Sequence, residues 1–342
     1  MAVAANVEIF RFSIQGLEEN LAVLRFAGEE AISRSYRYSV EVVSEDPQLG
    51  IDSLIGTPAC LTLMDADESE QRHVHGIIEQ AQLLDQGVRL SRYRFHIVPQ
   101  LQMLAYKSNN RIYQNQTIPS ILKQLLEDIG ISADRYRMQL QQEHPKHGYR
   151  VQYQETDLNF ITRLMEEEGL IYYFEHSDSA HIMIIADGGA SHTEIDPATV
   201  RYRDPSGLVP AGEQSVRSIS QRYSIRPGAV VMRDYRFDKP GMDLQVTQQA
   251  ESSSRPSMAS AAQGHPAQVR PGLEEYRYPG GYQDEQHGQR LSRYRLEAIT
   301  AERDMLQGQS DCRGFKAGYR YTLEDHPHEG FNRSQLIVSL QQ

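Results

Sequence analysis

The sequence of 342 residues contains no tryptophan and only two cysteines, Cys60 and Cys312. Two distant cysteines argue against a disulfide framework and lack the spacing of a zinc motif, so we expect a reducing compartment. No apolar run approaches the roughly 18 residues of a membrane-spanning helix, and stable membrane insertion is not expected. The first residues also lack a basic segment followed by an apolar one, so no classical signal peptide is expected. Synthesis in the cytoplasm is the prediction.

The chain also contains fewer basic than acidic residues. Lys and Arg number 35 against 46 Asp and Glu, which gives a formal net charge of −11. Such a chain repels phosphate, so nucleic acids and anionic lipid surfaces are not expected partners. Hydrophobic residues make up 39% and charged residues 24%, as in soluble globular proteins. The length exceeds one ordinary domain, so two or three structural units are expected.

The first hundred residues alternate between apolar and polar side chains. A period of two indicates strands with one buried face, and turn residues separate the runs. Many short strands with regular turns favour a closed antiparallel barrel, which removes exposed edges. The alternating apolar positions are Phe10, Phe12 and Ile14; Tyr36, Tyr38, Val40 and Val42; and Tyr93, Phe95 and Ile97.

Near residue 100 the period changes to that of a helix. One helix is predicted to start at Thr117-Ile118-Pro119 and to end at Gly130. A second is predicted to start at Thr156 and to end at Gly169, which suits a left-handed C-cap. A hairpin of residues 170–174 and 181–186 follows. These elements predict an α/β unit between β-rich regions.

From about residue 215 the pattern favours strands again, including 291–297, 313–323 and 335–340. Residues 249–272 are rich in Ser, Ala, Pro and Gln and predict a long loop. The six residues Arg89 to Arg94 recur letter for letter as Arg290 to Arg295. Both copies fall in expected strands, so the repeat is either chance or the trace of an internal duplication.

Neither the acidic cluster nor the histidine pairs indicate a catalytic site. Glu166, Glu167 and Glu168 are adjacent on a helix, about 100° apart, and are interpreted as a solvated face. His73 and His75 project from one face of a strand and could ligate zinc, but no third ligand with recognisable spacing accompanies them. The pairs His144 and His147, and His326 and His328, are interpreted as polar loop and turn residues.

Motifs of nucleotide-binding and hydrolytic enzymes are missing from the sequence. The segment Asp187-Gly188-Gly189 ends a strand and is not expected to open a phosphate-binding helix. In the Arg-Tyr repeats, neighbouring side chains of a strand face opposite ways, so these tyrosines are assigned to the core. We therefore predict no catalytic residues, no cofactor-binding residues and no metal ligands, and no cofactor.

Residues 151–176 resemble the hallmark segment of VgrG proteins, a family of type VI secretion spike proteins. Residues 28–38, 235–240, 278–282 and 326–332 are similar to its further landmarks, in order along the chain. The resemblance implies a mainly β fold with an α/β insertion, like a phage baseplate hub, with two related antiparallel tube-type barrels and an α/β buttress. It also implies a C-terminal needle in full-length members, beyond what this sequence contains.

The resemblance implies four regions. The first barrel is expected at 1–105, the buttress at 106–215, the second barrel at 216–248 and 287–342, and a loop excursion that joins the buttress at 249–286.

The implied function is structural. Three chains would form a threefold ring with pseudo-sixfold symmetry that caps the hexameric Hcp tube. Baseplate components, and effector or adaptor proteins, are further expected partners. The assembly would form in the cytoplasm and then be secreted by the contractile apparatus into the extracellular space or a target cell. The alternatives are the baseplate hub of a contractile phage or prophage tail with a cell-wall-cleaving role, and a carbohydrate-binding adhesin.

Overall fold

The computed structural model describes residues 9–19, 21–64, 70–204, 213–250 and 273–342. Within these ranges the chain forms two compact units. Unit 1 contains residues 1–199, 312–322 and 334–342, and unit 2 contains residues 200–311 and 323–333. None of the helices in the described ranges combines the length and apolar character needed to span a bilayer.

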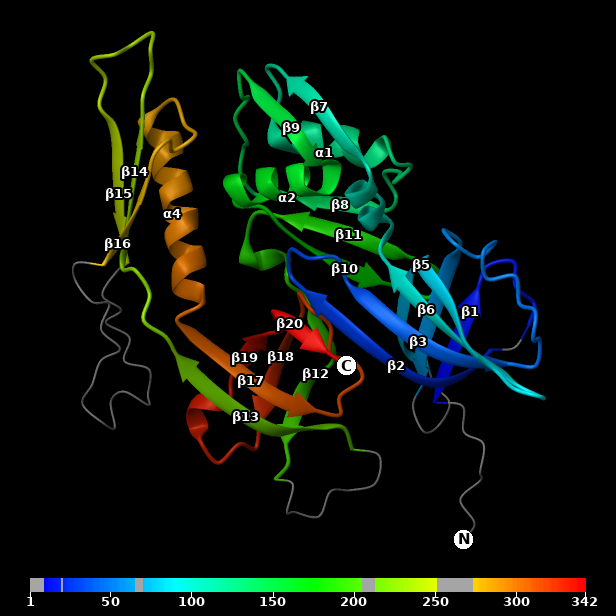
Figure 1. Cartoon of the computed structure of the whole chain (residues 1–342). Coiled ribbons are helices and arrows are strands. Elements are labelled where there is room, and N and C mark those ends of the chain that lie inside the picture. Colours follow the sequence, from blue (N-terminus) through cyan, green and yellow to red (C-terminus); the bar gives the residue numbers. More distant parts are fainter. Residues whose placement is uncertain (1–8, 20, 65–69, 205–212, 251–272) are drawn as a thin grey trace. The chain divides into compact units, whose positions relative to one another are not determined.

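The N-terminal part of unit 1 is a closed antiparallel barrel of six strands (Figure 1). The strand order is β1-β4-β5-β6-β3-β2, and β2 pairs back with β1 to close the barrel. The short strand β20 (Ser339–Gln341) adds to β2 from outside the ring. The barrel strands are β1 (Phe10–Ile14), β2 (Leu21–Ala31), β3 (Arg37–Ser44), β4 (Pro58–Met64), β5 (Glu70–Gln86) and β6 (Ser91–Val98).

The predicted alternation is confirmed in these strands. Tyr38, Val40 and Val42 of β3 are fully buried, as are Phe95 and Ile97 of β6. Because side chains of a strand alternate between faces, these residues fill the barrel interior while their neighbours face outward. The buried side chains anchor a hydrophobic core that continues into the α/β part of unit 1.

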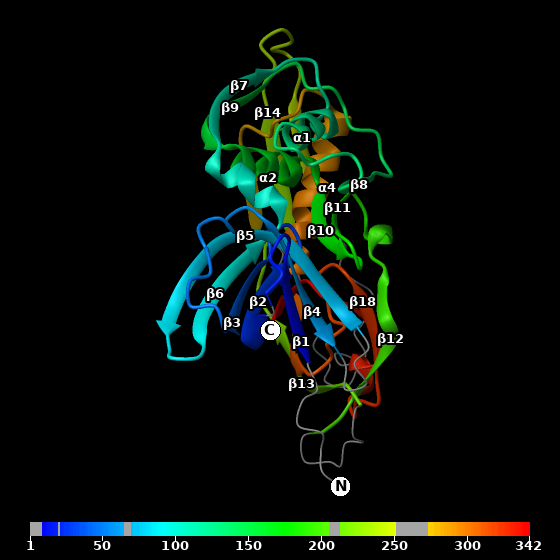
Figure 2. The same cartoon turned by 90° about the vertical axis from the view of Figure 1, so that its right-hand side faces the viewer.

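The α/β part of unit 1 contains the helices α1 and α2, which Figure 2 shows next to the barrel strands. Both predicted helix starts are confirmed: the Thr117 and Thr156 side chains cap the backbone N–H groups of Ser120 and Asn159. Gly169 adopts the left-handed conformation predicted for it, with φ of 73°. The elements are η1 (Gln100–Tyr106), β7 (Ser108–Tyr113), α1 (Ile118–Glu127), β8 (Tyr136–Gln139), β9 (Arg150–Thr156), α2 (Asp157–Glu168), β10 (Ile171–His176), β11 (His181–Ala186) and η2 (Gly189–Ser191).

Two small sheets hold this part together. Strands β7 and β9 pair antiparallel, and the second sheet has the order β10-β11-β8. The β10–β11 hairpin confirms the prediction, and β8 lies parallel to β11. The C-terminal segment returns to unit 1 with β18 (Arg320–Glu324) and β19 (Ser334–Leu336), which pair antiparallel.

Unit 2 contains an antiparallel strand pair and a separate sheet covered by a long helix. Strands β13 (Ser215–Tyr223) and β17 (Asp304–Ser310) form the pair, and the last residues of β12 (Glu194–Tyr202) lie parallel to β13. The sheet has the order β15-β14-β16. Helix α4 packs against it, as Figure 1 shows. The elements are β14 (Ala229–Asp234), β15 (Leu244–Gln249), β16 (Glu274–Arg277), α4 (Glu285–Ala301) and η3 (Glu329–Phe331).

Helix α4 contradicts the strand predicted at 291–297. The Asp284 side chain accepts a hydrogen bond from the backbone N–H of His287 and so caps the helix. Leu291, Leu296 and Ile299 follow at helical spacing and pack against the β14–β15 sheet. The second copy of the repeated six residues therefore lies in a helix, and the repeat has no shared structural context.

Three further boundaries differ from prediction. The strand expected at 313–323 begins only at Arg320, and the one expected at 335–340 is two short strands, β19 and β20. Within the expected loop excursion, residues 274–277 form β16, while 251–272 lie outside the described residues. The prediction of a mainly β fold with an α/β insertion is confirmed, and unit 1 contains one closed six-stranded barrel.

Candidate functional site

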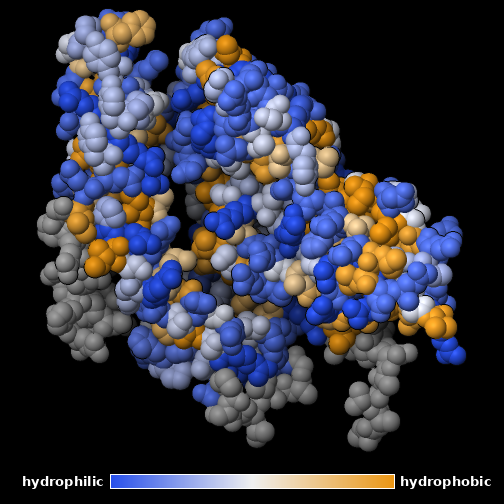
Figure 3. Space-filling model, in the orientation of Figure 1, coloured by the Kyte–Doolittle hydropathy of each residue, from blue (hydrophilic) through white to orange (hydrophobic). Residues whose placement is uncertain are grey.

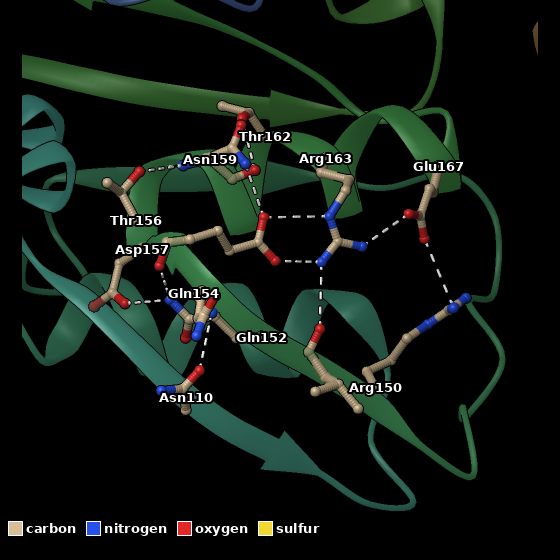
Figure 4. A network of polar contacts seen from close by, with 12 residues as sticks. Asn110, Arg150, Gln152, Gln154, Thr156, Asp157, Asn159, Thr162, Arg163 and Glu167 are labelled. Carbon is tan, nitrogen blue, oxygen red and sulfur yellow. Dashed lines mark hydrogen bonds and ion pairs between the residues drawn. The ribbon is translucent and has the colours of Figure 1, made fainter.

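The β9–α2 junction contains the segment that resembles the hallmark of VgrG proteins (Figure 4). Gln152 is fully buried, and its amide donates to the Asp157 carboxylate at 2.7 Å and to the Glu155 carbonyl at 3.1 Å. Asp157 is also fully buried and lies 3.9 Å from Lys107 Nζ and 3.7 Å from an Arg111 nitrogen. A buried carboxylate needs such partners, so these contacts fix the entry into α2.

Arg163 of α2 ties the helix back to the same junction. Its guanidinium donates to Glu155 at 2.5 Å, to Glu167 at 3.0 Å and to the Val151 carbonyl at 3.3 Å. Glu167 also lies 3.7 Å from Arg150 of β9 (Figure 4). The hallmark segment is thus a structural joint between a strand and a helix.

The solvated-face interpretation of Glu166 to Glu168 is wrong for Glu168, which is 1% exposed. His144 Nδ1 lies 3.1 Å and His147 Nε2 lies 3.4 Å from the Glu168 carboxylate. The buried Asp187 carboxylate lies 3.4 Å from His144 Nε2 and accepts from two backbone N–H groups of the loop after β8. Two histidines and two carboxylates therefore fasten the 140–149 loop to α2 and β11.

Asp187-Gly188-Gly189 follows β11 as expected and leads only into the three-residue 3-10 helix η2. His326 and His328 lie in the loop between β18 and β19, as predicted. Their rings pack on Phe331 at centroid distances of 4.8 and 4.9 Å. The Asn332 side chain closes this loop through hydrogen bonds with the His326 backbone.

A buried ion pair links the barrel wall to the returning C-terminal segment of unit 1. Arg72 of β5 is fully buried and pairs with Glu30 of β2. The same guanidinium donates to the Phe315 carbonyl at 2.6 Å and to the Tyr38 hydroxyl at 3.1 Å. Glu30 also accepts from the backbone N–H of Ala317 at 3.2 Å. The charges are compensated by several hydrogen bonds, as a buried pair requires.

On the outer face of the barrel, Glu41 of β3 lies between two arginines. Arg25 of β2 donates to it at 2.8 and 2.9 Å, and Arg94 of β6 donates at 2.5 and 3.1 Å. Hydrogen bonds from Arg25 and then Arg94 lower the pKa of Glu41 to about 2. This cross-strand ladder confirms that Arg94 of the first repeat faces away from the core.

A cluster of metal-ligating side chains lies on the outer face of β4 and β5. Cys60 pairs in register with His75, and Thr62 pairs with His73. Among the residues described, Cys60, His73 and His75 are the group of three whose ligand atoms lie close together, all within 4.8 Å of one another. Sequence analysis found the two histidines but missed Cys60. Only the register of the β4–β5 pairing reveals it.

Similar folds occur in tail proteins. A type VI secretion component of E. coli, itself described as similar to T4 phage tail proteins, aligns with a TM-score of 0.69 at 21% identity, covering 97% of this chain and 72% of its own. The tail protein of Neisseria meningitidis MC58 aligns at 0.64 and 11% identity, covering 97% and 91%. The 43 kDa tail protein of Shewanella oneidensis prophage MuSo2 aligns at 0.60 and 12%, covering 97% and 93%. The chain therefore shares the fold of these tail proteins.

Residues 29–342 match the family described as phage tail baseplate hub (GPD), and the chain belongs to this family. It is also 38% identical to the type VI spike protein VgrG4b of Pseudomonas aeruginosa, over 97% of this chain and 39% of that protein. VgrG5 of the same organism is 34% identical, over 99% and 41%. The resemblance inferred from residues 151–176 is confirmed. The chain spans about two fifths of the length of these relatives.

Proposed function

We propose that this chain is the hub region of a type VI secretion spike. The observation that carries the proposal is the 38% identity to a type VI spike protein over 97% of the chain. The hub fold agrees with it, because a closed barrel removes free strand edges and offers a rigid wall for assembly. The function is structural, and it is performed by subunit faces instead of a small set of reacting side chains.

Three copies of the chain form the proposed hub. The barrel of unit 1 is one wall segment, and strands β13 and β17 belong to a second tube-type wall within 216–248 and 287–342. Residues 106–215, with the 249–286 excursion, act as the buttress. Three chains with two walls each give a threefold ring with pseudo-sixfold symmetry that stacks on the hexameric Hcp tube. Because the repeated six residues lie in a strand and a helix, this duplication rests on the family resemblance alone.

The β5–β6 hairpin of the barrel offers apolar contacts for such an assembly. Val88 is fully exposed, Leu83 and Leu90 are 40% and 47% exposed, and Leu24 of β2 is 52% exposed. Apolar side chains interspersed with polar ones are visible on the barrel in Figure 3. We assign these side chains to the subunit contacts of the proposed ring.

The proposed partners beyond the homotrimer are the Hcp tube, baseplate components, and effector or adaptor proteins. Assembly takes place in the cytoplasm, followed by ejection into the extracellular space or a target cell. Catalytic, cofactor and metal residues are not part of this function.

One alternative is the baseplate hub of a contractile phage or prophage tail. The two tail proteins from Neisseria and the Shewanella prophage favour it, because this chain covers more than 90% of each of them. Their identities of 11% and 12% are far below the 38% to the spike protein, which favours the spike. Peptidoglycan release by the purified chain, lost on substitution of one Asp or Glu, would support a cell-wall-cleaving hub.

Sedimentation of the purified chain tests the proposal. A trimer is expected for the chain alone, or once the needle region of a full-length relative is joined to it. Co-sedimentation with hexameric Hcp is expected for the trimer. A monomer under both conditions, with no binding to Hcp, would contradict the proposal.

A further inference from the structure

The cluster of Cys60, His73 and His75 lies outside the barrel core. Ala59, Leu61 and Leu63 of β4 are buried in the barrel, so the side chains between them face outward. Cys60 Sγ lies 3.7 Å from His75 Nε2 and 4.0 Å from His73 Nδ1. The antiparallel register of β4 and β5 therefore brings one sulfur and two imidazole nitrogens together on one rigid surface.

These separations suit a single metal ion of tetrahedral preference. Zinc–sulfur bonds of about 2.3 Å and zinc–nitrogen bonds of about 2.0 Å at a tetrahedral angle place sulfur and nitrogen roughly 3.6 Å apart. The distances from Cys60 Sγ to the two histidine nitrogens, 3.7 and 4.0 Å, are close to this value. One thiolate and two imidazoles are ligands that zinc prefers over magnesium or calcium.

The surroundings of His73 orient it for ligation. Its Nε2 lies 3.7 Å from the Asp178 carboxylate, and its Nδ1 lies 3.2 Å from the Thr62 hydroxyl. A carboxylate beside Nε2 favours the tautomer with the proton on that nitrogen. The lone pair on Nδ1, which lies 3.2 Å from the Thr62 hydroxyl and 4.0 Å from Cys60 Sγ, is then available to a metal ion, as in a carboxylate–histidine–zinc triad.

His75 is held by the β10–β11 hairpin. Its backbone N–H donates to His176 Nδ1 at 3.1 Å, and its Nε2 lies 2.8 Å from the Ser177 carbonyl. Metal binding at Nε2 requires the tautomer with the ring proton on Nδ1, so the hydrogen bond to the Ser177 carbonyl is given up. The Ser177 carbonyl oxygen, released from this bond, or a water molecule would supply the fourth ligand.

We propose that Cys60, His73 and His75 bind one Zn²⁺ ion, and that the ion fastens strands β4 and β5 of the barrel to the loop between β10 and β11. The site goes beyond the hub function and does not depend on it. Cys60 binds as a thiolate, so its thiol proton passes to the solvent when the ion enters. The same side chains without metal form a hydrogen-bonded cluster, which is the competing account.

Cobalt titration of the metal-free full chain distinguishes the two accounts. We expect a thiolate-to-Co²⁺ charge-transfer absorption that saturates at one equivalent and disappears when Zn²⁺ is added. The Cys60→Ser variant should lose this absorption. Cys312→Ser, which removes the chain's other thiol, is the matched control and should retain it.

Zinc titration calorimetry gives the contribution of each side chain. His73→Gln and His75→Gln should each weaken Zn²⁺ binding at least tenfold, and Asp178→Asn less than tenfold, because this carboxylate is exposed to solvent. Circular dichroism of each variant verifies folding. Zinc should raise the melting temperature of the wild type and leave that of Cys60→Ser unchanged.

The proposal is overturned if the wild-type chain shows no charge-transfer absorption at one equivalent of Co²⁺. It is also overturned if Cys60→Ser retains the absorption, or if only Cys312→Ser loses it.

Discussion

The same six residues fold as an extended segment entering β6 in unit 1 and as part of α4 in unit 2. In the first copy, Tyr93 is 1% exposed inside the barrel, and Arg94 pairs with Glu41. In the second, Tyr294 is only partly buried, and Arg295 pairs with Glu275 at 2.7 Å. Identical residues therefore find different partners, and the neighbouring sequence decides which structure they adopt.

The residues that flank the two copies favour different secondary structures. The first copy continues into Phe95, His96, Ile97 and Val98, whose alternation and β-branched side chains favour a strand. The second copy is preceded by the N-cap Asp284 and followed by residues 296–301, which suit a helix. Local propensity within six residues is too weak to override these signals.

The largest expected difference in unfolding free energy is between alanine substitutions of the two tyrosines. Tyr93→Ala leaves a cavity in the barrel and removes the hydrogen bond to the Asp46 carbonyl, so it should cost about 3–5 kcal/mol of unfolding free energy. Tyr294→Ala should cost about 1 kcal/mol, because this ring is partly exposed. Denaturant unfolding of both variants measures the difference. Equal losses of unfolding free energy would contradict the different burial of the two rings.

Breaking the helix is the next test. Ser292→Pro places proline inside α4 and should cost about 3 kcal/mol or more, with a loss of helical circular dichroism. Ser292→Ala is the matched control, since alanine favours the helix and removes only the hydroxyl's bond to the Gln289 carbonyl. If the proline variant retained the full helical signal, the assignment of the second copy to a helix would fail.

Smaller effects are expected for the two arginines. Arg94→Gln and Arg295→Gln each remove an ion pair with a partly exposed arginine, so each should cost about 1 kcal/mol or less. The loss at Arg94 should be partly offset, because Arg25 still contacts Glu41. Chemical denaturation at low and high salt measures both, and a loss above about 3 kcal/mol at either site would contradict the surface character of these pairs.

The smallest expected effect is a change in the pKa of Glu41, which tells the contribution of Arg94 from that of Arg25. Its pKa falls from 4.5 to about 2 on folding, so its contribution to stability is complete above pH 4.5 and is lost as the pH falls toward 2. Arg94→Gln should move this pKa up toward 4.5. Carboxyl titration followed by NMR provides the measurement. An unchanged pKa in the variant would show that Arg25 alone holds the charge.

Sequence reasoning succeeded where a signal is local. The alternation of Tyr38, Val40 and Val42 and the caps at Thr156 and Gly169 could be predicted, because each depends on residues close in sequence. Helix α4 carried the same kind of signal in Asp284, but the repeated six residues favoured a strand interpretation.

The features that sequence reasoning missed depend on contacts between distant segments. Glu168 is buried because His144 and His147 reach it from a loop more than one element away. Cys60 joins His73 and His75 only through the register of β4 and β5. The spacing of these residues along the chain does not predict that register, because a shift by one residue moves every side chain to the other face.

An electron-microscopy average of the purified chain, viewed down its presumed axis, tests the central claim of a hub most directly. The account predicts a threefold ring whose channel is lined by six similar wall segments. A single isolated particle without threefold symmetry, for the chain alone and for the chain joined to a needle region, would contradict it.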